Sequence, residues 1–393
     1  MREINSTKQK ILIVGLIGVL ILAIVMIAVM FLGDRKDKGQ TVNNTVNTND
    51  DSNQEGIDQG SKIINKNGEE VEKDGNFLKL AINDIYGLKM KKGTNQAMFY
   101  QQQQILSVDP FSGKKYAIGS YPFKEISSFS WSQDDTKALV MDAKDYYIYE
   151  ASSNLVHKFR YGIDNAIWNI KGDRIIYKYY DSSTGKREIK TADVNGENNQ
   201  IVASGIPYRK VDLIVQPGIN SICYFPHPDA RVKGKLFCKN LNGEIKKEYG
   251  GRYGQDYLWS PDGSKLLTSF TKEESGNKVV LGVMNKSGGE ARGLSIGTTV
   301  RKCVWSQNNV DVYCAVLGGA PLAIMLPNAW EEQVFNSVDT FWKINTETGE
   351  KKRLVNLDNM TFVIDSESLT LDAEESFLFF ISRRDRSLWR LKL

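Results

Sequence analysis

A few short features of this 393-residue chain have residue types and spacing that could support chemistry. The segment GLSIG, at Gly293 to Gly297, matches the G-x-S-x-G pattern of a nucleophilic serine. That pattern requires a strand before the serine and a helix after it. Ser295 is instead expected between two strands, so we do not expect it to act as a nucleophile.

The only two histidines, His157 and His227, fall in different copies of the repeat described below, so they are not expected to converge. His227 lies between two prolines, which favours a rigid turn over a ligand site. Neither a phosphate-binding loop, a dinucleotide fingerprint nor an HExxH helix occurs. We therefore predict no enzyme, no catalytic or metal-binding residue and no cofactor.

Carboxylates in loops are the basis of an alternative, a glycan- or peptide-directed enzyme that uses acidic residues around a central channel. Ordinary turn chemistry accounts for these residues, because Asp side chains bond nearby backbone N–H groups in turns. The carboxylates concerned are Asp134, Asp135, Asp173 and Asp262. Clustered carboxylates with shifted pKa values at one channel mouth would favour the enzyme, and an exposed apolar insertion would favour binding.

The four cysteines form two local pairs. In RKCVWSQNNVDVYCAV, a turn at Asn308 and Asn309 places Cys303 opposite Cys314. A longer loop can bring Cys223 alongside Cys238 in the same way. Cross-strand neighbours lie near the separation that a disulfide needs, so we predict two disulfides and an exported domain. Four buried thiols are the alternative, and zinc is disfavoured because no His or CxxC spacing accompanies them.

The chain is built on a repeat, best seen in YLWSPDGSKLLTSF at residues 257–270. Related hairpins recur at intervals of 37 to 47 residues, with a final interval of 66, and their anchor residues are Met90, Trp131, Trp168, Val215, Trp259, Trp305 and Leu371. A second hairpin with a polar turn follows each anchored one, which predicts four-stranded antiparallel units. Units of this length are typical of propeller blades.

Seven anchors predict an all-β, seven-bladed propeller, with six blades as the alternative. Because the last unit stops after its third strand, ring closure requires an outer strand from the start of the domain, which we expect around Glu70 to Asp74. Phe77 to Ile82 is then predicted as the innermost strand of the first blade.

The WSPDG motif at Trp259 to Gly263 resembles the repeat of TolB-like, WD-repeat-like propellers, over about residues 70–393. Other copies depart from it as WSQDD, WNIKGD and WSQNN. The resemblance implies that these residues build the turn: Pro261 presets φ, Asp262 bonds backbone N–H groups and Gly263 takes the left-handed conformation. The residues that pack between blades are Trp131, Trp168, Trp259 and Trp305. Activity must be argued from a site, because the family ranges from periplasmic scaffolds to propellers attached to peptidases.

The long interval before Leu371 contains about 20 residues more than a blade needs, rich in apolar and aromatic groups. These could contact a partner, and a loop folded onto its own blade is the alternative. The candidate partner-binding residues are Pro321, Met325, Leu326, Trp330 and Phe335.

The N-terminal part predicts membrane attachment. Residues 11–32 carry no charged side chain and, at about 1.5 Å per residue, are long enough to cross a bilayer as an uncleaved signal anchor. Residues 1–10 are expected as a cytoplasmic tail, 33–69 as a flexible, Asn-rich linker and 70–393 as the propeller. Basic residues are equally numerous before and after the helix, so charge does not determine its orientation in the membrane. We infer a cytoplasmic N-terminus from the short N-terminal tail and from the predicted disulfides.

Together these features predict a bacterial-type, single-pass cell-membrane protein whose propeller lies in the cell envelope. We expect a non-enzymatic platform for a protein, peptide or glycan. A ligand sensor is a further alternative. The net charge of +4 is spread along the chain and gives no case for nucleic-acid binding.

Overall fold

The computed structural model describes residues 63–64, 70–71, 76–159, 162–219, 221–240, 247–355 and 362–393. The chain divides into two compact units, residues 1–57 and 58–393, and every described residue belongs to the second. The predicted tail, membrane helix and nearly all of the predicted linker therefore lie outside the described residues. In the described part of the chain, no helix is long and apolar enough to span a membrane.

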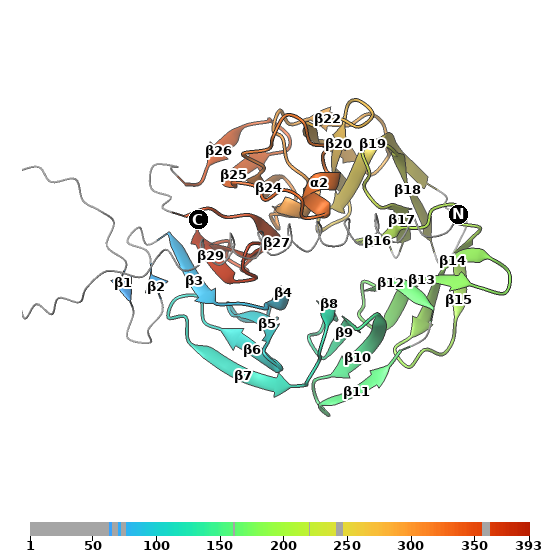
Figure 1. Ribbon diagram of the computed structural model, residues 1–393, viewed down its shortest axis with the longest axis horizontal. Helices are drawn as coiled ribbons and strands as arrows, with labels where there is room; N and C mark the ends of the chain where they lie inside the picture. The colour runs from blue at the N-terminus through green and yellow to red at the C-terminus, as the bar shows by residue number, and fades with distance from the viewer. Residues whose placement is uncertain are drawn as a thin grey trace, which may run out of the picture. The chain divides into compact units, whose positions relative to one another are not determined.

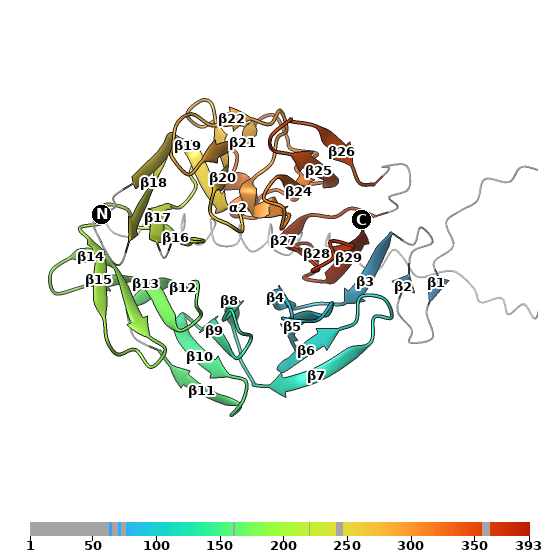
Figure 2. The same cartoon turned by 180° about the vertical axis from the view of Figure 1, so that it is seen from behind.

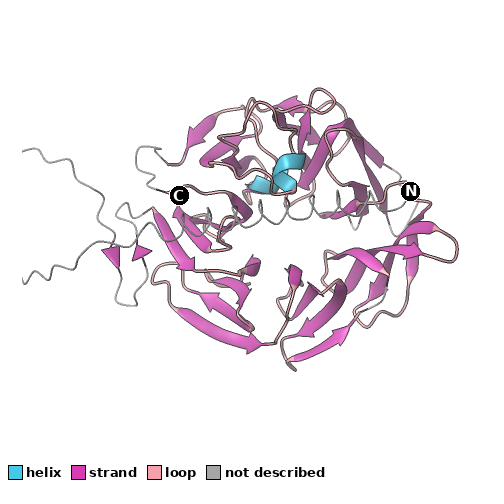
Figure 3. Ribbon diagram, viewed as in Figure 1, coloured by secondary structure: helices cyan, strands magenta, loops and turns pink. Residues whose placement is uncertain are grey.

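The second unit is built almost entirely of antiparallel sheets in which strands adjacent in sequence are adjacent in space (Figures 1 and 3). The first three four-stranded sheets confirm the predicted meanders. The first sheet contains β4 (Tyr86–Met90), β5 (Ala97–Gln101), β6 (Gln104–Val108) and β7 (Lys115–Ser120). The second contains β8 (Ile126–Trp131), β9 (Lys137–Asp142), β10 (Asp145–Glu150) and β11 (Leu155–Lys158). The third contains β12 (Ile163–Trp168), β13 (Arg174–Asp181), β14 (Lys186–Asp193) and β15 (Gln200–Ser204).

The next sheet has seven strands because one long strand serves two meanders. The strands are β16 (Val211–Gln216), β17 (Ser221–Pro226), β18 (Lys233–Asn240), β19 (Lys247–Trp259), β20 (Lys265–Thr271), β21 (Val279–Asn285) and β22 (Arg292–Gly293). The first half of β19 pairs with β18 and its second half with β20. Positive φ angles at Gly250, Gly251 and Gly254, which glycine adopts without steric cost, let the strand turn from one meander into the next.

Two four-stranded sheets complete the unit. One contains β23 (Cys303–Trp305), β24 (Asp311–Val316), β25 (Thr340–Asn345) and β26 (Lys351–Arg353), and the other contains β27 (Ser366–Leu371), β28 (Phe377–Ser382), β29 (Leu388–Lys392) and β3 (Phe77–Ala81). Short helical turns are η1 (Val300–Lys302) and α2 (Asn328–Glu331), and β1 (Ile63–Ile64) pairs with β2 (Glu70–Val71). The sheets follow one another around a common centre, with the first strand of each innermost (Figures 1 and 2).

Strand β3 closes the ring, and here the predicted strand assignment is wrong. Phe77–Ala81 is the outer strand of the last sheet, paired with β29, and the innermost strand of the first sheet is β4. Packing explains the placement, because the Phe77 ring makes edge-on contacts with Phe341 and Phe380 at 5.7 and 6.4 Å. The sequence prediction was right that an N-terminal strand completes the last unit, but it chose a segment several residues too early.

Tryptophan anchors connect neighbouring sheets. The indole N–H groups of three of them donate to carbonyls in the first strand of the preceding meander, which is β4, β8 and β19 in turn. These bonds are Trp131 to Gly87 (2.7 Å), Trp168 to Ser130 (3.0 Å) and Trp305 to Leu258 (3.2 Å). Each anchor therefore combines burial of a large ring with a hydrogen bond across the sheet–sheet boundary.

Both predicted disulfides are formed. Cys223 faces Cys238 across β17 and β18, and Cys303 faces Cys314 across β23 and β24. The pairing of Trp305 with Val312 confirms the hairpin register predicted for the second pair.

Candidate functional site

One repeat position gathers polar side chains at the centre of the ring. It lies three residues before the anchor, where Asn165 precedes Trp168, Asp212 precedes Val215 and Asp256 precedes Trp259. The first strands of the sheets lie innermost, so side chains at this position can converge. The three polar residues line one cavity of 260 Å³ together with Arg301.

Arg301, in η1, connects the carboxylates around this cavity. Its guanidinium pairs with Asp212, with Asp256 (Nε to Oδ2, 2.8 Å) and with Glu331 (Nε to Oε1, 3.1 Å). Asp212 and Asp256 come from β16 and β19, whereas Glu331 comes from α2 in the long segment between β24 and β25. One cation therefore links two neighbouring meanders and the predicted insertion.

Burial and these contacts shift the titration of the cluster. Burial opposes the charge of Arg301, but Asp256, Glu331 and Asp212 outweigh it and raise the arginine pKa. Burial raises the pKa of Glu331 above its usual range, although Arg301 partly opposes the shift. Burial would also raise the pKa of Asp212, but its hydrogen bond to His227 and the charge of Arg301 lower it instead. The two carboxylates thus have pKa values moved in opposite directions.

His227 extends the cluster outward. Its Nδ1 lies 3.0 Å from Asp212 Oδ2 and 3.1 Å from Oδ1. This hydrogen bond to the carboxylate raises the pKa of His227, with burial opposing it. The residue lies in the loop between β17 and β18, as the flanking prolines suggested, but the loop also forms one wall of a cleft.

That cleft has a volume of 710 Å³ and is lined by residues of three chain segments, 207–210, 226–232 and 328–332. Asp229 binds Arg231 at 2.6 Å, and the side chain of Asn328 accepts a hydrogen bond from the Ala230 N–H at 2.9 Å. The second contact fixes α2 against the β17–β18 loop. The cleft walls are therefore held in place by polar contacts between segments distant in the sequence.

Charges of both signs face this cleft. Arg209 and Lys210 also line it, and within the described residues neither side chain forms a salt bridge. The buried side chain of Lys178 donates to the carbonyl of Arg209, which fixes the loop that carries both cations. Glu332 contributes an exposed carboxylate. The arrangement suits a polar ligand that carries both positive and negative groups.

Lys302, next to Arg301, forms a second cluster. Its fully buried Nζ lies 2.7 Å from Asp339 Oδ2, 2.7 Å from Asp365 Oδ1 and 2.8 Å from the Ser366 carbonyl. The Trp330 indole N–H also donates to Asp365, at 3.0 Å. Adjacent residues thus face different partners: Arg301 binds β16, β19 and α2, and Lys302 binds the end of the insertion and the start of β27.

The predicted partner-binding insertion is folded largely onto the unit itself. Leu326, Trp330 and Phe335 are buried in one cluster with Val279. Pro321 is exposed and Met325 is half-buried. A partner-binding role for these residues remains a prediction, and the three buried ones are not available as exposed apolar contacts.

The loop carboxylates singled out from the sequence take part in turns. Asp134 accepts hydrogen bonds from Ser132 (2.6 Å) and Thr136 (2.8 Å), and Asp262 accepts one from Ser260 (2.7 Å). These turns follow the anchors, at the opposite end of the first strands from the residues of the Arg301 cluster. The carboxylates that do cluster, Asp212, Asp256 and Glu331, were missed, although the position that Asp212 and Asp256 share before their anchors was a usable signal.

The other residues that the sequence analysis considered for chemistry do not lie together. His157 lies in β11, with its Nε2 3.2 Å from the Val194 carbonyl, in a different sheet from His227. Ser295 lines a separate cleft that neither histidine lines. Among the residues that the structure describes, no three His, Cys, Asp or Glu side chains are placed to hold a metal ion.

Four-stranded antiparallel sheets around a common centre, closed by an N-terminal strand, define a β-propeller fold. No protein-family model and no curated protein matches the sequence. Solved structures do match the fold. An oligogalacturonate lyase in complex with manganese is 10% identical, with a TM-score of 0.56 over 86% of this chain and 98% of that one.

Two further solved structures show a weaker likeness. The tricorn protease is 12% identical, with a TM-score of 0.50 over 82% of this chain and 34% of that one. TolB from Acinetobacter baumannii is 13% identical, with a TM-score of 0.44 over 71% of this chain and 64% of that one. At these identities the similarity concerns the fold alone, and neither activity nor ligand is transferred by it.

Proposed function

We propose that this protein is a membrane-anchored, TolB-like β-propeller of seven blades that binds a peptide or other polar ligand of the cell envelope without transforming it. The seven-blade count treats β19 as the outer strand of one blade and the inner strand of the next. Residues 11–32 supply the anchor and the propeller lies outside the membrane. The two disulfides support that location, since disulfides persist in oxidising compartments.

The observation that carries the proposal is the 710 Å³ cleft with charges of both signs on fixed walls. Its volume falls within the range of about 300–1,000 Å³ usual for ligand sites. Arg209 and Lys210 can bind carboxylates, while the exposed Glu332 can bind an amine. None of the described residues that line the cleft is a serine, threonine or cysteine, which disfavours catalysis by those three nucleophiles.

A second candidate is an enzyme that works by proton transfer at the same cleft. It is favoured by His227, oriented by Asp212, and by Glu331, whose pKa is raised by burial. Carboxylates with pKa values shifted apart are a feature of acid–base sites. This candidate uses Asp212, His227 and Glu331 rather than the loop carboxylates first considered.

Photo-crosslinking of the full chain in cells tests the binding proposal. Replacing Tyr208, which lines the cleft, with benzoylphenylalanine should give a discrete adduct, and adding Arg209→Glu and Lys210→Glu should abolish it. Tyr180, an exposed tyrosine of β13, is the matched control position. Equal adducts from both positions, or none from Tyr208, would contradict the proposal.

The enzyme candidate has a separate readout. Purified protein is incubated with envelope glycan and peptide fractions, and the products are followed by mass spectrometry. Turnover that disappears in His227→Gln while the Tyr208 adduct persists would support the enzyme. An unchanged fraction with a persistent adduct supports binding alone.

A further inference from the structure

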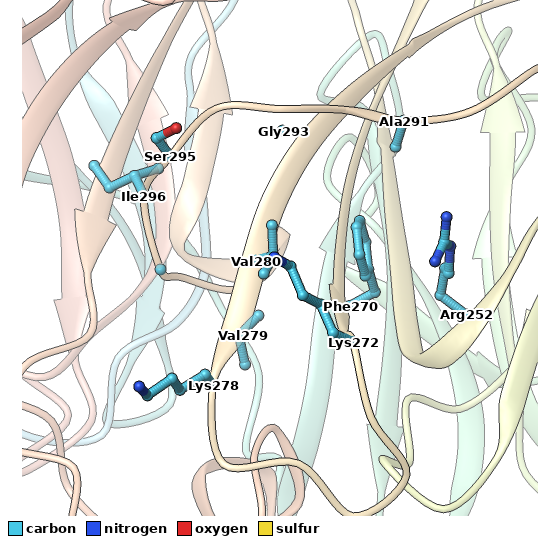
Figure 4. A pocket seen from close by; sticks show the side chains of 11 residues that line it. Arg252, Phe270, Lys272, Lys278, Val279, Val280, Ala291, Gly293, Ser295 and Ile296 are labelled. Atoms are coloured by element: carbon cyan, nitrogen blue, oxygen red, sulfur yellow. The ribbon is translucent and has the colours of Figure 1, made fainter.

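A second cleft, of 630 Å³, lies beside β20 and β21 (Figure 4). Its walls come from β19, β20, β21 and the GLSIG segment, Gly293 to Gly297. No described residue lines both this cleft and the 710 Å³ cleft beside His227. The volume again falls in the range of about 300–1,000 Å³ seen for ligand sites, and neither the repeat nor the proposed function accounts for it.

The charge of this cleft has one sign. Arg252, Lys272 and Lys278 line it, and none of the described residues that line it is acidic (Figure 4). Lys272 and Lys278 form no salt bridge within the described ranges. Arg252 reaches Glu290 at 3.4 Å, but the Glu290 side chain is 91% exposed, and such surface pairs contribute little. The positive charge of the cleft is therefore largely uncompensated.

Apolar groups form the rest of the cleft. Val279, Val280 and Ile296 line it beside the three cations. Phe270, the one aromatic residue among the described lining residues, is only 7% exposed and has the Arg252 guanidinium 5.6 Å from its ring centroid. Little of an aromatic face is thus open for a sugar ring or a nucleobase to stack on, which disfavours glycans and nucleic acids.

We propose that this cleft binds an acidic peptide segment that also carries apolar side chains. Its carboxylates would pair with Lys272, Lys278 and Arg252, and its apolar side chains would contact Val280 and Ile296. The GLSIG segment thereby gains a role as a wall of a binding cleft rather than as a nucleophile elbow. Because the two clefts share no described lining residue, this site does not depend on the ligand proposed for the cleft beside His227.

Fluorescence anisotropy with the detergent-solubilised full chain tests the proposal. The probe is a labelled hexapeptide, Glu-Leu-Glu-Glu-Leu-Glu, compared with its lysine counterpart and with a carboxylated oligosaccharide of equal charge. We expect the acidic peptide alone to bind, with a Kd that rises with salt as the charges are screened. Lys272→Gln with Lys278→Gln should raise the Kd about tenfold.

Two variants complete the design. Lys171→Gln with Lys186→Gln removes the same charge from exposed positions and should leave the Kd unchanged. Gly293→Phe should block the cleft, because Gly293 lines it; a Cβ at this position meets no atom within 4 Å. The proposal is overturned if the oligosaccharide or the lysine peptide binds as tightly, if the control pair weakens binding equally, or if no peptide binds.

Discussion

Arg301 and His227 set the electrostatics of the cluster that contains Asp212. The guanidinium holds Asp212 and Asp256 together, and the imidazole hydrogen-bonds the same Asp212. Since the pKa of His227 is raised in the folded state, its charged form is the one that the fold favours. The stabilisation is fully present below the unfolded pKa of about 6.5 and is lost as the pH rises through the folded value.

A titration of the two histidines checks this account. The imidazole signal that is absent in His227→Asn should titrate above about 6.5, the ordinary value for histidine. Asp212→Asn should lower that pKa, because it removes the hydrogen bond and the negative charge. His157 is the internal control. A His227 signal that titrates at or below the ordinary value would contradict the geometry of the pair.

Single residues also show how far the sequence could predict the site. The cysteine pairing followed from strand register alone, because side chains directly opposite on neighbouring strands are adjacent. The Arg301 cluster could not be predicted in this way, because two of its members come from outside the repeat pattern. Glu331 lies in α2 and His227 lies in a loop. Asp212 and Asp256 occupy equivalent repeat positions, and that equivalence was readable without a structure.

At the scale of elements, the insertion between β24 and β25 joins the two charged clusters. Trp330 lies against Asp365 and the neighbouring Glu331 lies against Arg301. The segment was predicted from its length and apolar content. Its role was not predictable, because whether apolar side chains face a partner or their own unit depends on packing between distant residues.

Lys302→Met tests the cluster that holds this insertion. The substitution leaves Asp339 and Asp365 buried without their cation, and breaking a buried pair in this way costs about 3–5 kcal/mol of unfolding free energy. Denaturant unfolding measures the loss. As a control, Lys171→Met, at an exposed position, should keep its unfolding free energy within about 0.5 kcal/mol of the parent value. Adding Asp339→Asn and Asp365→Asn to Lys302→Met should recover part of the lost stability. A loss near zero for Lys302→Met would show that the cluster does not stabilise the insertion.

The hairpin disulfides make a second element-scale prediction. Cys303 and Cys314 are 11 residues apart and Cys223 and Cys238 are 15 apart, so loop-closure entropy assigns each bond about 3 kcal/mol. Replacing either pair by serine should lower the unfolding free energy by that amount, with the longer loop losing slightly more. Unchanged unfolding curves in the double variants, compared with the oxidised parent, would contradict this.

At the scale of the whole molecule, the repeat predicted the propeller architecture. It did not predict which N-terminal segment closes the ring. Four-stranded units were readable because their anchors and turns recur locally. The strand that closes the ring pairs with β29, whose sequence lies at the other end of the chain. No local pattern in Phe77–Ala81 distinguishes an outer strand from an inner one, and its packing against Phe341 and Phe380 decides the matter.

The location of the propeller is the claim on which the binding role rests. Thiol labelling of intact cells with a membrane-impermeant maleimide, with and without a reductant, tests it most directly. The account predicts labelling only after reduction, with mass mapping that links Cys223 to Cys238 and Cys303 to Cys314. Free thiols that react only after lysis would place the propeller in the cytoplasm and contradict the proposed role in the cell envelope.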